Sequence, residues 1–153
     1  MGEELRPMPR LLAALPCEDA AVSFGVYDRR CSLQRVYFDL YAERFPADFD
    51  RLVVAALWSG GEGSYTMQAR IVGPGGEEIA VGETEMEALP PTATNTQLVY
   101  FYPLALPEPG PYTVQVLLDG AEVHTFPLHV IRLVSPEELE GEAEDEGEEE
   151  RDE

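Results

Sequence analysis

The chain of 153 residues contains 30 Asp and Glu residues against 10 Lys and Arg residues, which gives a net charge of −20 at pH 7. This length suits one domain with its own core, because domains commonly run to about 100–150 residues. All ten basic residues are arginine. Chemistry that needs a lysine amine, such as Schiff-base formation or P-loop phosphate binding, is therefore excluded.

The negative charge also argues against nucleic acid as a partner. An acidic surface repels phosphate backbones, so binding would require a local basic patch. The arginines that could form such a patch lie early in the chain, at Arg29, Arg30, Arg35 and Arg44. We expect no direct contact with nucleic acid.

The N-terminal sequence predicts neither export nor a membrane anchor. The apolar run Leu11–Leu15 follows early glutamates and is too short for a signal peptide. No stretch approaches the ~20 apolar residues of a membrane-spanning helix. We therefore expect a protein of a bacterial-type cytosol, where Cys17 and Cys31 remain thiols.

Short β-rich runs, separated by Gly, Pro or Asp clusters, fill the chain from Ala20 to Val134. They predict an all-β, antiparallel sandwich of about eight strands, and no long helical period competes with them. The expected strands are Ala20–Tyr27, Ser32–Ala42, Arg51–Trp58, Tyr65–Val72, Glu77–Glu87, Gln97–Leu104, Tyr112–Leu118 and Glu122–Leu133.

Turn residues predict three hairpins between these strands. Ser59–Gly63 and Gly73–Gly76 can adopt positive φ, and Asp119-Gly120 is typical of a two-residue hairpin loop. Apolar residues alternate along Tyr112–Leu118, so one face of that strand should be buried. The preceding Pro-Gly-Pro is typical of the start of an immunoglobulin-like strand, where the tyrosine hydroxyl bonds to the backbone.

The C-terminal residues predict a short helix start and a disordered acidic tail. Ser135, Pro136 and Glu138 suit the N-cap, N1 and N3 positions of a helix, which Gly141 should end. Of the 30 acidic residues, 12 follow Pro136, and the self-repelling tail has little to bury. We divide the chain into an N-terminal arm (1–14), a sandwich domain (15–134) and a tail (135–153).

The sequence contains few His and Cys residues that could bind a metal ion or act as a thiol nucleophile. His124 and His129 are five residues apart, which puts them on opposite faces of a regular strand unless a bulge at Pro127 intervenes. Neither Cys17 nor Cys31 lies in a nucleophile motif. We predict no metal site and no cofactor.

Carboxylates give no convincing catalytic pair. Glu83, Glu85 and Glu87 share one face of a strand at about 7 Å per step, a spacing compatible with glycosidases. Such a row more often marks a solvated strand face. Asp48 and Asp50 lack the further oxygen ligands and the glycine of a calcium loop, so we expect them to cap the next strand. We predict no catalytic residue and no enzymatic activity.

The segment Cys31–Asp39, followed by Arg44–Ala47 and Leu52–Val54, resembles a family of small bacterial proteins known only as a domain of unknown function. The later segments Val72–Glu77 and Pro107–Gly120 fit the same pattern, so the resemblance covers about residues 15–134. It implies an immunoglobulin-like sandwich. It implies no activity and transfers no catalytic or ligand residue.

Two strands carry apolar residues on both faces. In Gln97–Leu104 we expect Val99 and Phe101 to point inward, because they have no polar atom that needs a partner. In Ser32–Ala42 the same reasoning puts three residues inside, namely Val36, Phe38 and Leu40. The tyrosines of both strands should then point outward.

Four tyrosines form the candidate interface: Tyr37, Tyr41, Tyr100 and Tyr102. Scattered, they would be ordinary surface aromatics, whereas on one sheet face they would form an amphipathic binding patch. We expect a non-enzymatic protein-interaction or adaptor module with a protein partner or self-association. The alternative is a small-molecule or carbohydrate-binding sandwich, with an enzyme only as the outside case.

Overall fold

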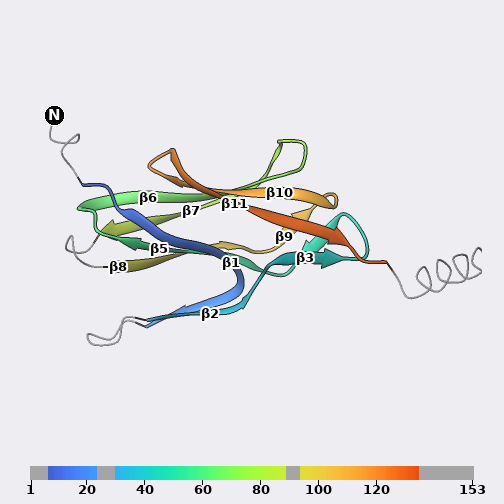
Figure 1. The fold of residues 1–153 in the computed structure, drawn as a ribbon, viewed down its shortest axis with the longest axis horizontal. Helices are drawn as coiled ribbons and strands as arrows, with labels where there is room; N and C mark the ends of the chain where they lie inside the picture. Colours follow the sequence, from blue (N-terminus) through green and yellow to red (C-terminus); the bar gives the residue numbers. More distant parts are fainter. Residues whose placement is uncertain (1–6, 24–29, 89–93, 135–153) are drawn as a thin grey trace, which may run out of the picture.

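The computed structural model describes residues 7–23, 30–88 and 94–134, and every regular element in these ranges is a strand (Figure 1). The chain is therefore all-β over the described residues, as the sequence predicts. The strands are β1 (Arg10–Val22), β2 (Cys31–Val36), β3 (Asp39–Ala42), β4 (Ala47–Phe49), β5 (Leu52–Ser59), β6 (Gly63–Val72), β7 (Glu78–Ala88), β8 (Thr94–Phe101), β9 (Leu104–Leu106), β10 (Gly110–Leu118) and β11 (Ala121–Arg132).

The strands form two sheets that lie one above the other (Figure 1). The four-stranded sheet has the order β2-β1-β5-β8, and all its neighbours are antiparallel. The five-stranded sheet has the order β3-β11-β10-β6-β7, in which only β3 and β11 are parallel. The short strands β4 and β9 make a separate two-stranded ribbon.

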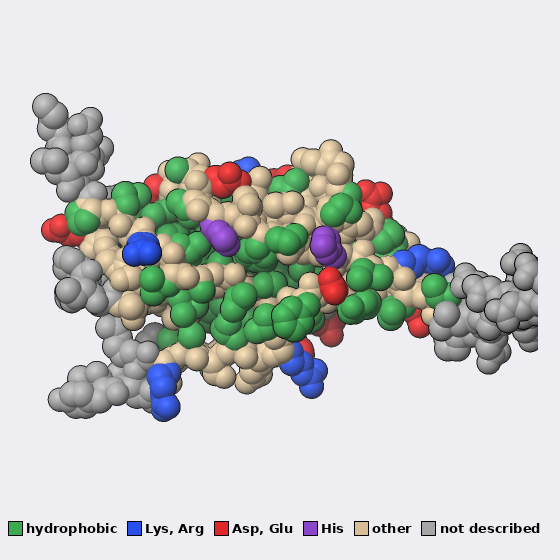
Figure 2. Space-filling view, viewed as in Figure 1, with side chains coloured by type: hydrophobic (Ala, Val, Ile, Leu, Met, Phe, Trp, Pro, Cys, Tyr) green, Lys and Arg blue, Asp and Glu red, His purple; other side chains and the backbone are tan. Residues whose placement is uncertain are grey.

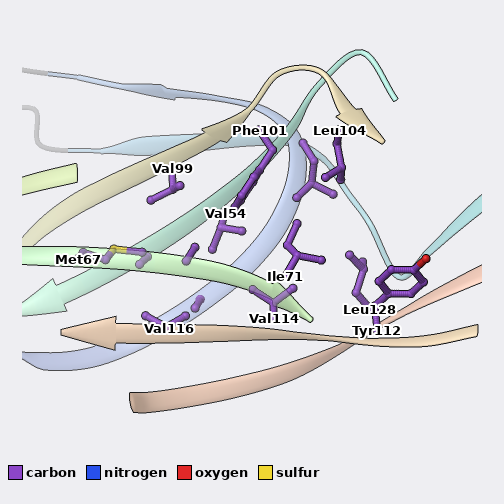
Figure 3. Packing of buried hydrophobic residues seen from close by; sticks show 14 of the residues in the cluster. Val54, Met67, Ile71, Val99, Phe101, Leu104, Tyr112, Val114, Val116 and Leu128 are labelled. Atoms are coloured by element: carbon purple, nitrogen blue, oxygen red, sulfur yellow. The ribbon is translucent and has the colours of Figure 1, made fainter. Parts of the chain in front are cut away.

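The main core lies between the two sheets (Figure 3). Val54 and Val99 of the four-stranded sheet point toward Ile71 and Val114 of the five-stranded sheet, and all are buried. On β10 every second side chain from Tyr112 to Leu118 is buried, so the alternation predicted for this strand is confirmed. Burial of this apolar area is the main stabilising contribution to the fold.

Tyr112 also anchors the start of its strand. Its hydroxyl donates a 2.6 Å hydrogen bond to the carbonyl of Glu108, although the residue is almost wholly buried. This confirms the predicted bond to the backbone, which satisfies a polar atom that would otherwise be costly to bury. Burial raises the pKa of the Tyr112 phenol above its usual value.

Two of the three predicted hairpins are present. Gly73–Gly76 joins β6 to β7, and Asp119-Gly120 joins β10 to β11 with both residues at positive φ. The third prediction is wrong, because Ser59–Gly63 carries the chain from one sheet to the other. β5 already pairs with β1 on one edge and β8 on the other, so no edge remains for β6.

The predicted strand Ser32–Ala42 is two strands in different sheets. Arg35 takes a positive φ of 54°, and the chain leaves the four-stranded sheet after Val36. This break resets the alternation, so the inward placement of Phe38 is wrong: it is 89% exposed. The outward placement of Tyr37 is also wrong, because Tyr37 packs partly buried against the main core.

Several other side chains predicted to point inward or outward in Ser32–Ala42 and Gln97–Leu104 do so. Leu40 is buried in the main core and Tyr41 is exposed, as predicted. Val36 is partly buried, but it packs on the outer side of the four-stranded sheet and not in the main core. On β8, Val99 and Phe101 are buried and Tyr100 is exposed, which confirms the inward assignment.

The sheet begins earlier than expected. β1 starts at Arg10, inside the segment assigned to an N-terminal arm, and Leu11 packs against the main core. Apolar residues on both faces of Leu11–Leu15 concealed the period of two. The helix start at Ser135 and the tail lie outside the described residues. The described ranges contain no helix with the length and apolarity that a membrane crossing requires.

Candidate functional site

The outer face of the five-stranded sheet is polar. Thr66 and Gln68 of β6 alternate with core residues and bond across to β7: Thr66 donates to Glu85 at 3.0 Å and Gln68 to Glu83 at 3.2 Å. The register places Glu87 in the same row. Cross-strand hydrogen bonds of this kind occupy the carboxylates along an exposed edge strand.

The outer face of the four-stranded sheet is apolar. The core side of β5 and β8 carries Val54, Ala56 and Val99, so the alternate residues point away from the core. The register arranges these alternate residues of β1, β5 and β8 in three successive rows, which we call the apolar face: Ala13, Leu57 and Thr96; Leu15, Ala55 and Leu98; Cys17, Val53 and Tyr100. None of the nine is charged.

Part of the apolar face is covered by the chain itself. β1 bends near its end, and β2 lies below the rest of the sheet (Figure 1). Leu33 and Val36 of β2 pack there against Cys17, Val53 and Ala55, which form a second buried cluster. The uncovered part includes Leu15 and Tyr100, which are 40% and 49% exposed.

Cys17 lies in the closed part of the face. Burial raises its pKa to about 11, and the nearby charge of Asp19 acts in the same direction. A thiol with such a pKa stays protonated at neutral pH and is a poor nucleophile. Cys17 therefore behaves as a small apolar side chain in this cluster.

The next row beyond the apolar face is charged and opens into a recess of about 470 Å³. Asp19 pairs with Arg51 at 2.9 Å, and the Arg51 guanidinium lies 5.8 Å from the centroid of the Tyr102 ring. We call this recess the acidic pocket. It is lined by three carboxylates, three aromatic rings, an amide and a guanidinium: Glu18, Asp19, Asp50, Tyr37, Phe49, Tyr102, Gln34 and Arg51.

The acidic pocket carries a net negative charge. Among the described residues that line it Arg51 is the one cation, whereas Glu18 pairs with the outlying, largely exposed Arg35 at 3.2 Å. Among the described residues Asp50 has no ion-pair partner. Burial raises the pKa of the Tyr37 phenol, and the charge of Glu18 raises it further.

The four tyrosines of the predicted interface do not share one surface. Tyr37 and Tyr102 line the acidic pocket, and Tyr100 lies on the neighbouring apolar face. Tyr41 belongs to β3 in the other sheet, where its hydroxyl donates to Asp39 at 3.3 Å. Three of the four therefore gather around one end of the four-stranded sheet.

The flank between β1 and β11 is a further apolar region. Figure 2 shows hydrophobic side chains across the middle of this flank, with both histidines among them. The register places His124 opposite Val116 on the core side of β11, and His129 opposite Pro111 on the other side, with no bulge at Pro127. Among the described residues, no group of three or more His, Cys, Asp or Glu could hold a metal ion.

Sequence reasoning missed the acidic pocket and the apolar face. The residues of the pocket come from four separate segments, so no local motif marks them. A signal for the face was present in β5, whose unbroken run Leu52–Trp58 contains no polar residue. Such a run is typical of a strand covered on both faces.

The described residues thus define an all-β protein of two layered sheets, with one apolar outer face that ends in an acidic pocket. Residues 12–131 match the model of a family of unknown function, DUF6941, and the chain belongs to that family. This confirms the resemblance to an uncharacterised family. No curated protein matches the chain.

Proposed function

We propose that the protein is a non-enzymatic protein-interaction or adaptor module that binds a different protein through the apolar face. The observation that carries the proposal is that three successive rows of an outer sheet face lack any charge in a chain of net charge −20. The uncovered part of this face, which includes Leu15 and Tyr100, is exposed apolar surface of the kind that is typical of interaction sites. Tyr100 adds a half-exposed tyrosine, a residue type enriched at binding hot spots.

Charge favours a different protein over a second copy of this chain. Two copies would each bring a net charge of −20, and such a pair repels itself. The acidic pocket borders the apolar face, so a partner with basic residues beside its own apolar patch is complementary in both respects. We expect that partner surface to combine leucine-like side chains with lysine or arginine.

We also propose that the fold is an immunoglobulin-like sandwich and that the protein works in the cytosol. Two layered sheets, antiparallel except for the pair β3–β11, and the hydrogen bond from Tyr112 to Glu108 support an immunoglobulin-like sandwich. The two unbridged thiols, Cys17 and Cys31, fit a reducing cytosol. The acidic pocket supports small-molecule binding as a second candidate function.

Tyr100 and Tyr41 provide a matched test of the binding face. They are 49% and 51% exposed, but only Tyr100 lies on the apolar face. A partner is captured with the full chain from lysate of the source cells, identified, purified and titrated by calorimetry. Tyr100→Ala should weaken its binding about tenfold or more, whereas Tyr41→Ala should change it by less than about twofold.

Two results would refute the proposal. One is a partner whose affinity falls equally with Tyr41→Ala and Tyr100→Ala, because the apolar face would then have no special role. The other is a dimer at micromolar concentration in sedimentation that Tyr100→Ala dissociates, since the face would then bind a second copy.

A further inference from the structure

We propose that the acidic pocket is a binding site for an organic cation, an ammonium or guanidinium group attached to a short apolar stem. The proposal concerns a different surface from the apolar face and would stand even if that face bound nothing. It rests on the shape of the recess, its charge and its aromatic walls.

The recess has the size of a small-ligand site. Its volume of about 470 Å³ falls within the range of about 300–1,000 Å³ that ligand pockets usually occupy. It forms where the ends of β1 and β2, the start of β5 and the end of β8 meet. Segments remote in the sequence therefore supply the walls of the recess, both from strands and from the connections that follow or precede them.

The charges of the recess select a cation. Three carboxylates line it. Among the described lining residues Arg51 is the one guanidinium, and it is paired with Asp19 at 2.9 Å, while Glu18 is paired with Arg35 at 3.2 Å. Asp50 is left as a carboxylate without an ion-pair partner among the described residues. A carboxylate or phosphate ligand would be repelled by Asp50 and would have to displace Asp19 from Arg51.

The aromatic walls suit the same class of ligand. Tyr37, Phe49 and Tyr102 line the recess, and the negative faces of aromatic rings attract cations within about 6 Å. Tyr102 already holds the Arg51 guanidinium at 5.8 Å from its ring centroid. This contact shows that the ring can take a guanidinium group as a neighbour. The stem of the ligand would pack against the remaining ring surface.

The cation can have two sources. It can be a free small amine, or it can be the lysine or arginine side chain of a protein docked on the neighbouring apolar face. Butylguanidinium and butylammonium represent the free cation. Acetyl-Leu-Arg-Leu-amide represents a side chain presented between apolar neighbours, as a partner docked on the apolar face beside Tyr100 would present it.

The test is a titration of the full chain, followed by amide chemical shifts and calorimetry. Butylguanidinium should bind saturably, with a Kd of about 1 mM, and shift the amides around Asp50, Arg51 and Tyr102. Acetate and N-acetylglucosamine at the same concentrations should not. Equal or tighter binding of either the anion or the neutral sugar would overturn the assignment to cations.

Variants locate the site. Asp50→Asn should weaken butylguanidinium binding about tenfold through the lost charge, and Tyr102→Leu about threefold through the lost ring. Asp48→Asn is the matched control, because Asp48 is exposed and does not line the recess. Circular dichroism confirms folding of each variant. The proposal is overturned if Asp48→Asn has the same effect as Asp50→Asn, or if neither pocket variant weakens binding.

The peptide distinguishes the two sources. If a partner supplies the cation, the peptide binds at least about tenfold tighter than butylguanidinium, and Tyr100→Ala removes only that gain. Equal affinity of peptide and butylguanidinium identifies a free amine as the ligand. That second outcome supports the cation site and leaves the apolar face without a role in it, so the two proposals fail separately.

Discussion

The outer faces of the two layered sheets are built by the same alternation along strands, yet they carry different kinds of side chain at the outward positions. On the five-stranded sheet, Thr66 and Gln68 engage the glutamates of β7 across the strand pair. On the four-stranded sheet, β5 places Val53 and Ala55 at the corresponding outward positions, and the bent β1–β2 segment covers them. The comparison shows that the outer face of a sheet can be covered by a hairpin of the same chain. Here the hairpin of β1 and β2 covers only part of that face.

The largest difference between the two faces is expected when a carboxylate is placed on each of them. Val53→Asp buries a charge among the apolar side chains of the second cluster and should lower the free energy of unfolding by at least about 3 kcal/mol. Val81→Asp makes the same change at a half-exposed site opposite Arg70. It should change stability by no more than about 0.5 kcal/mol. Urea denaturation measures both, and equal losses would contradict the assigned difference between the faces.

The second-largest effect is expected from alkaline pH, which should lower the stability of the fold through the buried thiol of Cys17. The folded pKa of Cys17 is about 11 against an ordinary value of 9.0, so the folded state holds the proton more tightly than the unfolded chain. Its stabilising contribution is complete below pH 9 and is lost as pH rises toward 11, by about 2 kcal/mol at that pH. The raised pKa values of Tyr37 and Tyr112 act in the same direction above their ordinary value of 10.0.

Unfolding curves between pH 7 and 11 test this expectation. Cys17→Ala should flatten the decline between pH 9 and 11, whereas Cys31→Ala, which removes the thiol outside the buried cluster, should leave the decline in place. A decline that both variants reproduce in full would show that burial of Cys17 does not couple folding to protons.

The smallest effect is expected on the polar face. Thr66→Val removes the hydroxyl that donates to Glu85 at 3.0 Å and keeps the shape of the side chain. Because the bond is exposed to water, stability should change by less than about 0.5 kcal/mol. Thermal unfolding provides the measurement. A loss above about 1 kcal/mol would mean that the polar network holds the sheet together, and that the two faces differ less than their composition suggests.

Local patterns in the sequence predicted those parts of the fold that depend on neighbouring residues. The alternation along Tyr112–Leu118 and the Asp119-Gly120 turn require only adjacent positions, and both are present. The path from β5 to β6 could not be predicted in this way, because it depends on which edges of β5 are already occupied. The position of Phe38 failed for a related reason, since one positive φ at Arg35 moves the chain to the other sheet.

The candidate sites were harder to predict than the strands. Three of the four selected tyrosines lie near the acidic pocket or on the apolar face, but the reason given for them was exposure alone. Asp19, Asp50 and Arg51 lie in one pocket only because the folded chain brings β1, β5 and β8 together, and this proximity cannot be read from the sequence. Residues that attract each other from such distant positions have no fixed spacing in the sequence, so no local motif predicts the pocket.

The parallel pairing of β3 with β11 has a consequence for synthesis of the chain. Asp39–Ala42 leaves the ribosome well before its partner His129–Arg132 has been made. At the usual elongation rate of about 5–20 residues per second, the early strand waits several seconds for the last one. When synthesis reaches Phe101, all strands of the four-stranded sheet have been made, but β10 and β11 of the other sheet have not. The nascent chain therefore presents its future core to the ribosome surface and to chaperones, and final closure follows release of the C-terminal strand.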